Sequence, residues 1–392
     1  MAIARHGAGP VAGLRALGSQ VHPVFMLPPL AASAFGALLA GTTRLGATAT
    51  RLAPLALAVH LVAVFFGLYT AHVKDGYVDF HRRNEDDDHP LTARGCRLAL
   101  GGATVGFALA LATVVAVAGP VAGVLTLPGW VIGYLHAPQF DTNPVTATAG
   151  YPAGVALALL GGFYVQAGTL SSAVLAFGTL FFVTLSGVKV VDDATDVVYD
   201  RSIGKRTVAV VVGPRRAREV AFGLMGGGMF LVVAFAVDGL FPAGAALAAV
   251  PFVAVAVFAA RADPELATML LIRGAYLFLA VLVAAIWFRP LAGVPLPDVG
   301  ILGPYTYLAT EVLFGAGALV LLRRTGAWAA AGRTVAVLYP LAYLWDWYTL
   351  EVGVFAIPLR TGVELLGIPL EEHLFMLVVP AFVVGVHELV NS

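Results

Sequence analysis

The sequence has little charge. Only 12% of its 392 residues are Asp, Glu, Lys or Arg, and 59% are hydrophobic, whereas about a quarter of the residues in a soluble domain are charged. This composition predicts an all-α, polytopic membrane protein, because long apolar helices satisfy their own backbone groups inside a bilayer. The formal net charge is zero, which gives no support to nucleic acid as a partner.

Cysteine and lysine are also scarce. Cys96 stands alone, which excludes an internal disulfide and a metal site built from cysteines. It lies beside Arg97 in a predicted loop, and we interpret it as incidental. The only lysines are Lys74, Lys189 and Lys205. No small-residue cleavage site follows the first apolar run, so we expect a retained helix there and not a signal peptide.

Apolar windows long enough to span a bilayer recur along the chain. We expect nine spans followed, after the Pro/Gly-rich link 290–304, by three more. These divide the chain into predicted domains 1–292 and 300–392. The expected spans are 24–42, 53–73, 99–118, 119–136, 151–168, 170–188, 219–238, 241–260, 267–289, 305–322, 334–350 and 371–388.

Basic residues gather in the predicted loops 74–97, 189–218 and 323–333. Even numbers of predicted helices separate these loops, which places all three on one side of the membrane. The positive-inside rule makes that side cytoplasmic. We therefore expect a multi-pass protein of the cell membrane with its acidic loops in the cytoplasm.

Acidic residues at helical spacing lie between Lys189 and Thr207. On a helix they share one face, and their mutual repulsion favours a bound cation. Mg²⁺ suits such ligands together with substrate phosphates. The second acidic cluster, as we call it, contains Asp192, Asp193, Asp196 and Asp200. The alternative is a solvated acidic loop.

A similar pattern occurs earlier, where Asp75 and Asp79 follow an apolar helix. We call this pair the first acidic cluster. Acids at the end of an apolar helix indicate a function, whereas the run Glu85–Asp88 is better explained as a solvated charge run. The two clusters suggest a duplicated half. Facing each other, they would hold two Mg²⁺ ions and a diphosphate.

This arrangement predicts ionisation of an allylic diphosphate, because metal ions and basic residues stabilise the leaving group. An apolar cavity would hold the prenyl chain, and aromatic faces would stabilise a carbocation. The predicted substrate-binding residues are Lys74, Lys189, Arg201, Lys205, Arg206, Tyr134 and Tyr164. The tyrosines are equally compatible with ordinary packing.

Residues 20–290 resemble the UbiA superfamily of intramembrane prenyltransferases. The resemblance rests on two acidic motifs four helices apart, nine spans and the phrase D-R-S-I-G-K-R-T-V-A-V. It implies a nine-helix bundle, Mg²⁺, a prenyl diphosphate and an apolar isoprenoid acceptor. The second acidic cluster fits the family pattern D-x-x-D-x-x-x-D, followed by Arg201, Gly204 and Thr207.

The first motif departs from the family pattern N-D-x-x-D-x-x-x-D. Asp75 stands where the family has Asn, Gly76 where it has the first Asp and Arg83 where it has the last. Only Asp79 falls on a family aspartate, and Asp86 is a candidate substitute. His89 begins a phrase, H-P-L, that resembles the basic-Pro-Leu phrase of relatives.

The last hundred residues carry further acids in apolar surroundings. Glu371 and Glu372 begin an apolar helix, and Asp346 lies near the end of the preceding one. A carboxylic acid in an apolar pocket can stay protonated and donate a proton to an alkene. We predict these three as catalytic residues. The alternative is a helix N-terminus stabilised by glutamates.

Residues 304–390 resemble one copy of the membrane lycopene cyclase domain, most specifically in P-L-E-E-H-L-F. Such cyclases generally combine two three-helix units. The resemblance therefore implies a homodimer, a second cyclase subunit or lost cyclase activity. Together the two resemblances imply a lycopene-elongase-like prenyltransferase joined to a carotenoid cyclase. The alternatives are a terpene synthase that needs no acceptor and an inactive membrane scaffold.

Overall fold

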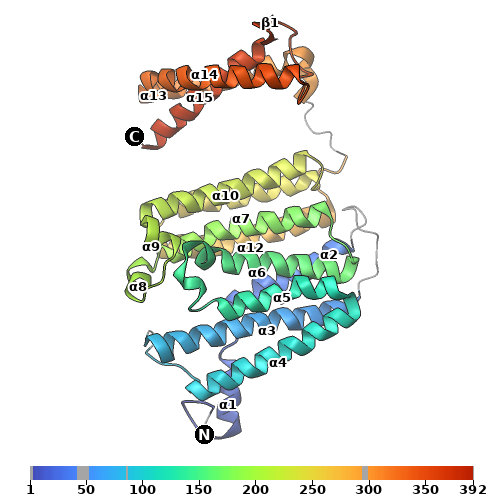
Figure 1. The fold of residues 1–392 in the computed structure, drawn as a ribbon, viewed down its shortest axis with the longest axis vertical. Helices are drawn as coiled ribbons and strands as arrows, with labels where there is room; N and C mark the ends of the chain where they lie inside the picture. The colour runs from blue at the N-terminus through green and yellow to red at the C-terminus, as the bar shows by residue number, and fades with distance from the viewer. Residues whose placement is uncertain (1–2, 42–52, 85–86, 294–298, 392) are drawn as a thin grey trace. The chain divides into compact units, whose positions relative to one another are not determined.

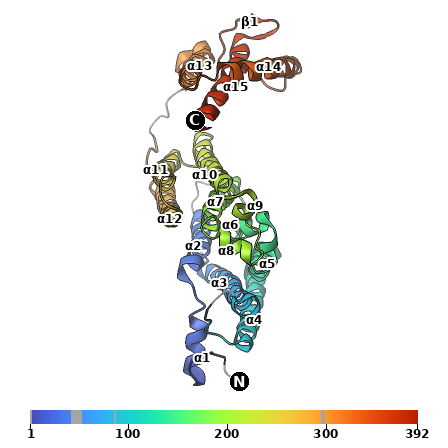
Figure 2. The same ribbon diagram turned by 90° about the vertical axis from the view of Figure 1, so that its left-hand side faces the viewer.

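The computed structural model describes residues 3–41, 53–84, 87–293 and 299–391. The chain forms two compact units, Met1–Ala292 and Gly293–Ser392, and their boundary falls in the link 290–304. Figure 1 shows helices throughout both units. Figure 2 looks along the helices of the first unit and shows α3, α4 and α5 beside α6, α7 and α10.

The first unit consists of helices and short helical turns. In chain order these are α1 (Gly9–Gly18), α2 (Pro23–Ala40), α3 (Pro54–Val78), the π-helical turn η2 (Asp79–Arg83), α4 (Ala93–Ala118), α5 (Pro120–Leu135), η3 (Phe140–Thr142), α6 (Pro144–Ala167), α7 (Ser172–Asp193), α8 (Val197–Ser202), α9 (Val208–Val212), α10 (Pro214–Val237), η4 (Ala243–Ala248), α11 (Ala249–Ala259) and α12 (Pro264–Phe288).

The second unit contains three long helices and a small hairpin. It begins with η5 (Val299–Tyr305), α13 (Thr306–Thr325) and α14 (Trp328–Glu351). An antiparallel pair, β1 (Glu364–Leu365) and β2 (Ile368–Pro369), then leads into α15 (Leu370–Asn391). Helix α15 packs against both α13 and α14.

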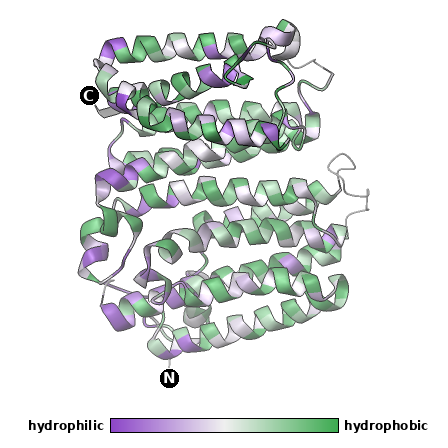
Figure 3. Ribbon diagram, turned by 45° about the horizontal axis from the view of Figure 1, so that its top comes forward, coloured by the Kyte–Doolittle hydropathy of each residue, from purple (hydrophilic) through white to green (hydrophobic). Residues whose placement is uncertain are grey.

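Nine helices of the described residues have the length and hydropathy to cross a membrane, seven in the first unit and two in the second. The segments Pro120–Leu135 and Ala243–Ala259 are apolar but shorter, and α14 is not among the nine. Figure 3 shows apolar colour along the helices and more polar colour at many of their ends. The predicted class, an all-α polytopic membrane protein, is confirmed, whereas the expected twelve long spans are not all present. The expectation that the acidic loops lie on the cytoplasmic side of the membrane stays a prediction.

The helix ends follow from local sequence. Proline stands in the first turn of α2, α3, α5, α6, α10 and α12, where its missing N–H is not needed. Side chains of Thr92, Asn143, Ser171 and Asp263 accept backbone hydrogen bonds at the starts of their helices, as capping residues do.

Helices α2 and α6 approach closely because glycine lies at their interface. A Cβ atom on Gly36 would come within 2.1 Å of the Leu159 carbonyl oxygen, and one on Gly162 within 2.0 Å of the Ser33 carbonyl oxygen. Larger residues at either position would force the helices apart. This contact holds α2 along one wall of the bundle, beside the cavity described below.

The structure corrects several predicted boundaries. Lys74, Asp75 and Asp79 lie within α3 and η2, not in a loop, and Cys96 is buried in the first turn of α4. Lys189, Asp192 and Asp193 form the last turn of α7. The span boundaries were wrong because isolated charges interrupt a hydropathy window without interrupting the backbone hydrogen bonds of a helix. The helical spacing of these acids had already indicated that they share a helix face.

Candidate functional site

One cavity of about 840 Å³ lies inside the first unit, between helices α2, α3, α5, α6, α7 and α12. Both acidic clusters line it, although they are more than a hundred residues apart in the chain. The ends of α3 and α7 that carry them lie on the same side of the unit as α8 and α9, at the left of Figure 1. The aspartates that line the cavity are Asp75, Asp79, Asp88, Asp141, Asp192, Asp193, Asp196 and Asp200.

The second acidic cluster is organised by Lys189. Its ammonium group donates hydrogen bonds to Asp192 Oδ2, at 3.0 Å, and to Asp193 Oδ1. Asp193 is buried, and its Oδ2 has no hydrogen-bond partner. A buried carboxylate oxygen without a partner is costly, so this oxygen is suited to a cation.

Short helix α8 and the turn after it hold the rest of the second cluster. Asp200 is buried, and Thr207 Oγ1 lies 3.4 Å from its Oδ2. Burial raises the pKa of Asp200 above its ordinary value, and the nearby Lys205 opposes that rise. Both Asp196 and Lys205 line the cavity. A cation beside Asp200 would favour its ionised form.

The first acidic cluster has different surroundings. Arg83 donates a hydrogen bond to Asp79 Oδ1 at 3.2 Å and another to Asp141 Oδ2 at 2.9 Å. The three side chains are no more than 16% exposed. The arginine at the last position of the first motif thus neutralises part of its negative charge. Asp75 lines the cavity without a comparable ion pair among the described contacts.

The glycine of the first motif gives space to a histidine. A Cβ atom at Gly76 would lie 2.5 Å from His89 Nε2, so any larger residue there would displace the ring. His89 is buried and lines the cavity. The imidazole therefore occupies the space next to position 76, where the family pattern has an aspartate. Glu85 and Asp86 lie outside the described residues, so the structure does not test Asp86 as the substitute for the missing aspartate.

Several predicted substrate-binding residues lie elsewhere. Of the seven, only Lys189 and Lys205 line the cavity. Lys74 donates a hydrogen bond to the Tyr134 carbonyl and lies 3.9 Å from the centre of the Tyr134 ring. Tyr164 packs against a cluster around Val114 and Val165. The side chains of Arg201 and Arg206 lie on the surface, outside the cavity lining.

The remainder of the cavity wall is largely apolar. Its aromatic residues include Phe107, Trp130, Tyr151, Phe181, Tyr276 and Phe278, which come from five helices. The hydroxyl groups of Tyr151 and Tyr276 donate to backbone carbonyls of Phe25 and Val24, so their rings stay fixed. One cavity thus combines a group of carboxylates at the helix ends with an apolar, aromatic interior.

The donor set fits Mg²⁺. Eight aspartates and two lysines line the cavity, and an anionic ligand would be repelled by this excess of carboxylates without added cations. Carboxylate oxygens are the ligands that Mg²⁺ prefers. Asp193, with its unpartnered Oδ2, and Asp196 and Asp200 are the residues best placed to hold it.

The predicted catalytic acids of the second unit have separate environments. Glu371 Oε1 accepts two hydrogen bonds from Thr361, one from the amide and one from the hydroxyl, both at 2.6 Å. Glu372 lies near enough to both Asp346 and Glu311 to interact with them electrostatically. Glu371 therefore holds the chain before the hairpin, whereas Glu372 and Asp346 form a carboxyl pair.

Several polar residues of the cavity were not predicted as site residues, among them Asp141, His72 and His89. Asp141 lies in η3, far in sequence from either cluster, and offered no motif. His72 and His89 both line the cavity. His72 precedes Asp75 at helical spacing, and that spacing was the only signal for it. Only the folded bundle brings Asp141 to Arg83.

No family model matches the chain, and no curated protein matches it. Several solved structures do match this chain. A UbiA homologue from Archaeoglobus fulgidus bound to GPP and Mg²⁺ is 19% identical to it with a TM-score of 0.52, and the match covers 70% of this chain and 99% of that one. A digeranylgeranylglyceryl phosphate synthase is 14% identical with a TM-score of 0.53, over 69% and 97%. A UbiA homologue from Aeropyrum pernix K1, without ligand, is 14% identical with a TM-score of 0.50, over 67% and 97%.

These similarities establish that the chain has the fold of UbiA-type intramembrane prenyltransferases. Each solved chain is matched almost completely, whereas roughly three tenths of this chain has no counterpart in them. Nothing in these similarities shows a cyclase domain, so the resemblance of residues 304–390 to lycopene cyclases stays a prediction.

Proposed function

We propose that the first unit is a Mg²⁺-dependent prenyltransferase that acts on a prenyl diphosphate and an apolar isoprenoid acceptor. The observation that carries this proposal is the single cavity, in which eight aspartates and two lysines stand at one end of an aromatic, apolar interior. The fold supports it, since one solved structure with this fold is bound to GPP and Mg²⁺.

Each part of the cavity has a role in this proposal. Asp193, Asp196 and Asp200 would hold Mg²⁺, with Asp75 and Asp192 as further ligands. Mg²⁺ held there would supply positive charge that stabilises the leaving diphosphate. Lys189 keeps Asp192 and Asp193 in place, and Lys205 contacts the diphosphate. Arg83 keeps Asp79 oriented.

The reaction is a substitution at the allylic carbon. The bond between that carbon and the diphosphate oxygen breaks, and its electron pair leaves with the diphosphate. The π electrons of the acceptor alkene then form the new carbon–carbon bond, and the carbocation that results on the acceptor loses a proton to the released diphosphate. Phe181, Tyr276 and Phe278 line the apolar interior, where they exclude water and present ring faces to the cation.

Labelled dimethylallyl or geranylgeranyl diphosphate, supplied to membranes that contain the protein, tests this function. We expect labelled product that requires an added acceptor, with lycopene as the first to try. Chelation of Mg²⁺ should abolish the product and readdition should restore it. An inactive scaffold predicts no product, and no change with Asp196→Ala.

A terpene synthase is the second candidate, and the departures in the first motif favour it. Gly76 and the Arg83–Asp79 pair leave fewer metal ligands at that end of the cavity. Such an enzyme would convert the diphosphate into a hydrocarbon or alcohol without an acceptor. Product formed equally with and without lycopene would therefore replace our first proposal with this one.

For the second unit we propose cyclisation of an alkene by proton donation. The nearness of Glu372 to Asp346 supports it, because two neighbouring carboxyl groups repel each other when both are ionised, which favours a proton on one of them. Glu372→Gln should abolish ring formation and leave chain addition intact. Glu371→Gln should act mainly on stability, since Glu371 binds Thr361.

Ring formation that requires a second copy of this unit would support a homodimer or a second cyclase subunit.

A further inference from the structure

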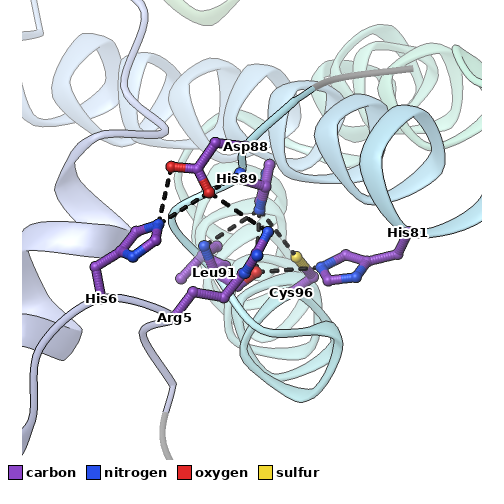
Figure 4. Close-up of polar contacts among 7 residues, drawn as sticks. All are labelled: Arg5, His6, His81, Asp88, His89, Leu91 and Cys96. Atoms are coloured by element: carbon purple, nitrogen blue, oxygen red, sulfur yellow. Dashed lines mark hydrogen bonds and ion pairs between the residues drawn. The ribbon is translucent and has the colours of Figure 1, made fainter. Parts of the chain in front are cut away.

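Three metal-binding side chains from separate segments converge beside the cavity, in the part of the first unit drawn in Figure 4. His81 belongs to the π-helical turn η2, His89 to the loop before α4, and Cys96 to the first turn of α4. The prenyltransferase proposal gives none of these three groups a metal-binding role.

The ligand atoms are close together. One nitrogen of each ring and the Cys96 sulfur lie within 4.8 Å of one another. His81 Nε2 and His89 Nδ1 each lie 3.1 Å from the Leu91 carbonyl oxygen. His89 Nδ1 also accepts a hydrogen bond from the Leu91 amide at 3.2 Å and lies 3.9 Å from Cys96 Sγ. Figure 4 shows these atoms directed toward a common point.

Both rings lie at hydrogen-bond distance from one carbonyl oxygen, and a metal ion at His89 Nδ1 would replace the hydrogen bond that this nitrogen accepts from the Leu91 amide. Tetrahedral Zn²⁺, with bonds of about 2.0–2.3 Å, places its ligand atoms roughly 3.3–3.6 Å apart. Shifts of about 1 Å or less in the side chains would bring the two nitrogens and the sulfur to that spacing. The Leu91 carbonyl oxygen or a water molecule would complete four ligands.

We propose that His81, His89 and Cys96 form a binding site for Zn²⁺ or a similar thiophilic divalent ion. The donor set decides the class of metal, because imidazole and thiolate favour Zn²⁺ over Mg²⁺. Binding displaces the proton of the Cys96 thiol, which leaves to solvent. A single cysteine excludes a site built from cysteines, but it does not exclude this mixed site.

The site would act as a clamp on the edge of the cavity. It joins the end of α3, the loop 87–92 and the start of α4, and this loop also contacts the N-terminal segment through Asp88 and His6, at 2.8 Å. Both Asp88 and His89 line the cavity. A metal ion at His89 Nδ1 would fix the ring that faces Gly76. The metal site itself does not depend on the prenyltransferase proposal.

Metal binding by the purified, detergent-solubilised full chain tests the proposal. We expect one Zn²⁺ per chain in competition with a chromogenic chelator, with no competition from Mg²⁺ at equal concentration. Co²⁺ at the site should show the thiolate-to-metal charge-transfer band. Cys96→Ser should remove that band, and His81→Gln should weaken Zn²⁺ binding at least about tenfold.

His6→Gln is the matched control, since His6 lies beside the cluster but its ring bonds Asp88 and is not one of the three ligands. It should bind Zn²⁺ like the unchanged protein. Thermal unfolding in the absence of metal checks that the variants fold. The proposal is overturned if folded Cys96→Ser and His81→Gln variants bind Zn²⁺ as tightly as the His6→Gln control, or if the unchanged protein binds none.

Discussion

Each acidic cluster of the first unit is preceded by a lysine, and the two lysines lie in different surroundings. Lys189 faces the cavity and bonds Asp192 and Asp193. Lys74 turns instead toward α5, where it contacts the carbonyl and ring of Tyr134. Two similar stretches of sequence therefore have different roles, because the helices packed against them differ.

The carboxylates of the two clusters also differ, in whether the protein already supplies them with a partner. Asp193 retains a buried oxygen without a partner, whereas Asp79 is already paired with Arg83. The second cluster is thus built to accept a cation, and the first is partly neutralised by the protein itself. Metal binding and catalysis should depend more on the second cluster.

The largest effect is expected from Asp193→Asn. Removing this charge should lower kcat/KM for prenyl transfer by about 10³-fold, because the leaving group loses metal-assisted stabilisation. Initial rates with labelled diphosphate measure it. Asp238→Asn, an exposed acid on the same unit, is the matched control and should change nothing.

Asp75→Asn should have a smaller effect, about tenfold in kcat/KM, because Asp75 assists a site whose main ligands lie on α7 and α8. The Mg²⁺ concentration that gives half-maximal rate should rise. An effect as large as that of Asp193→Asn would mean that the two clusters contribute equally, and our contrast between them would be wrong.

Arg83→Gln tests whether the protein itself neutralises the first acidic cluster, and its expected effect is on stability. Without the guanidinium group, Asp79 and Asp141 lose their shared partner, and the free energy of unfolding should fall by about 1–3 kcal/mol. Added Mg²⁺ should restore more thermal stability to this variant than to the unchanged protein. Arg215→Gln, which removes only an exposed pair with Glu219, should not alter the melting temperature.

The smallest effect is expected from Tyr134→Phe. Lys74 uses the backbone carbonyl and the ring face of Tyr134, and phenylalanine keeps both. Activity should remain within about twofold, since the cation–π contact survives. A large loss of diphosphate affinity, seen as a raised KM, would return Tyr134 to the substrate-binding residues.

Much of the fold was predictable because its signals are local. Apolar runs gave most long helices to within several residues, and the spacing of Asp193, Asp196 and Asp200 gave the second cluster. Asp79 in η2 and Cys96 in α4 were misplaced, since hydropathy does not report where backbone hydrogen bonding ends. Asp141 and His89 could not be predicted as partners of the site, because only packing brings η3 and the loop before α4 to it.

The all-α membrane class and the position of the two acidic clusters at helix ends follow from the sequence alone, because hydropathy and helical periodicity are properties of neighbouring residues. Which charges meet follows only from the packing of the helices. Arg83 joins Asp79 to Asp141, Lys74 leaves the cavity for Tyr134, and Glu371 binds Thr361. Such pairs depend on how helices distant in sequence pack, and the spacing of residues along the chain does not record this.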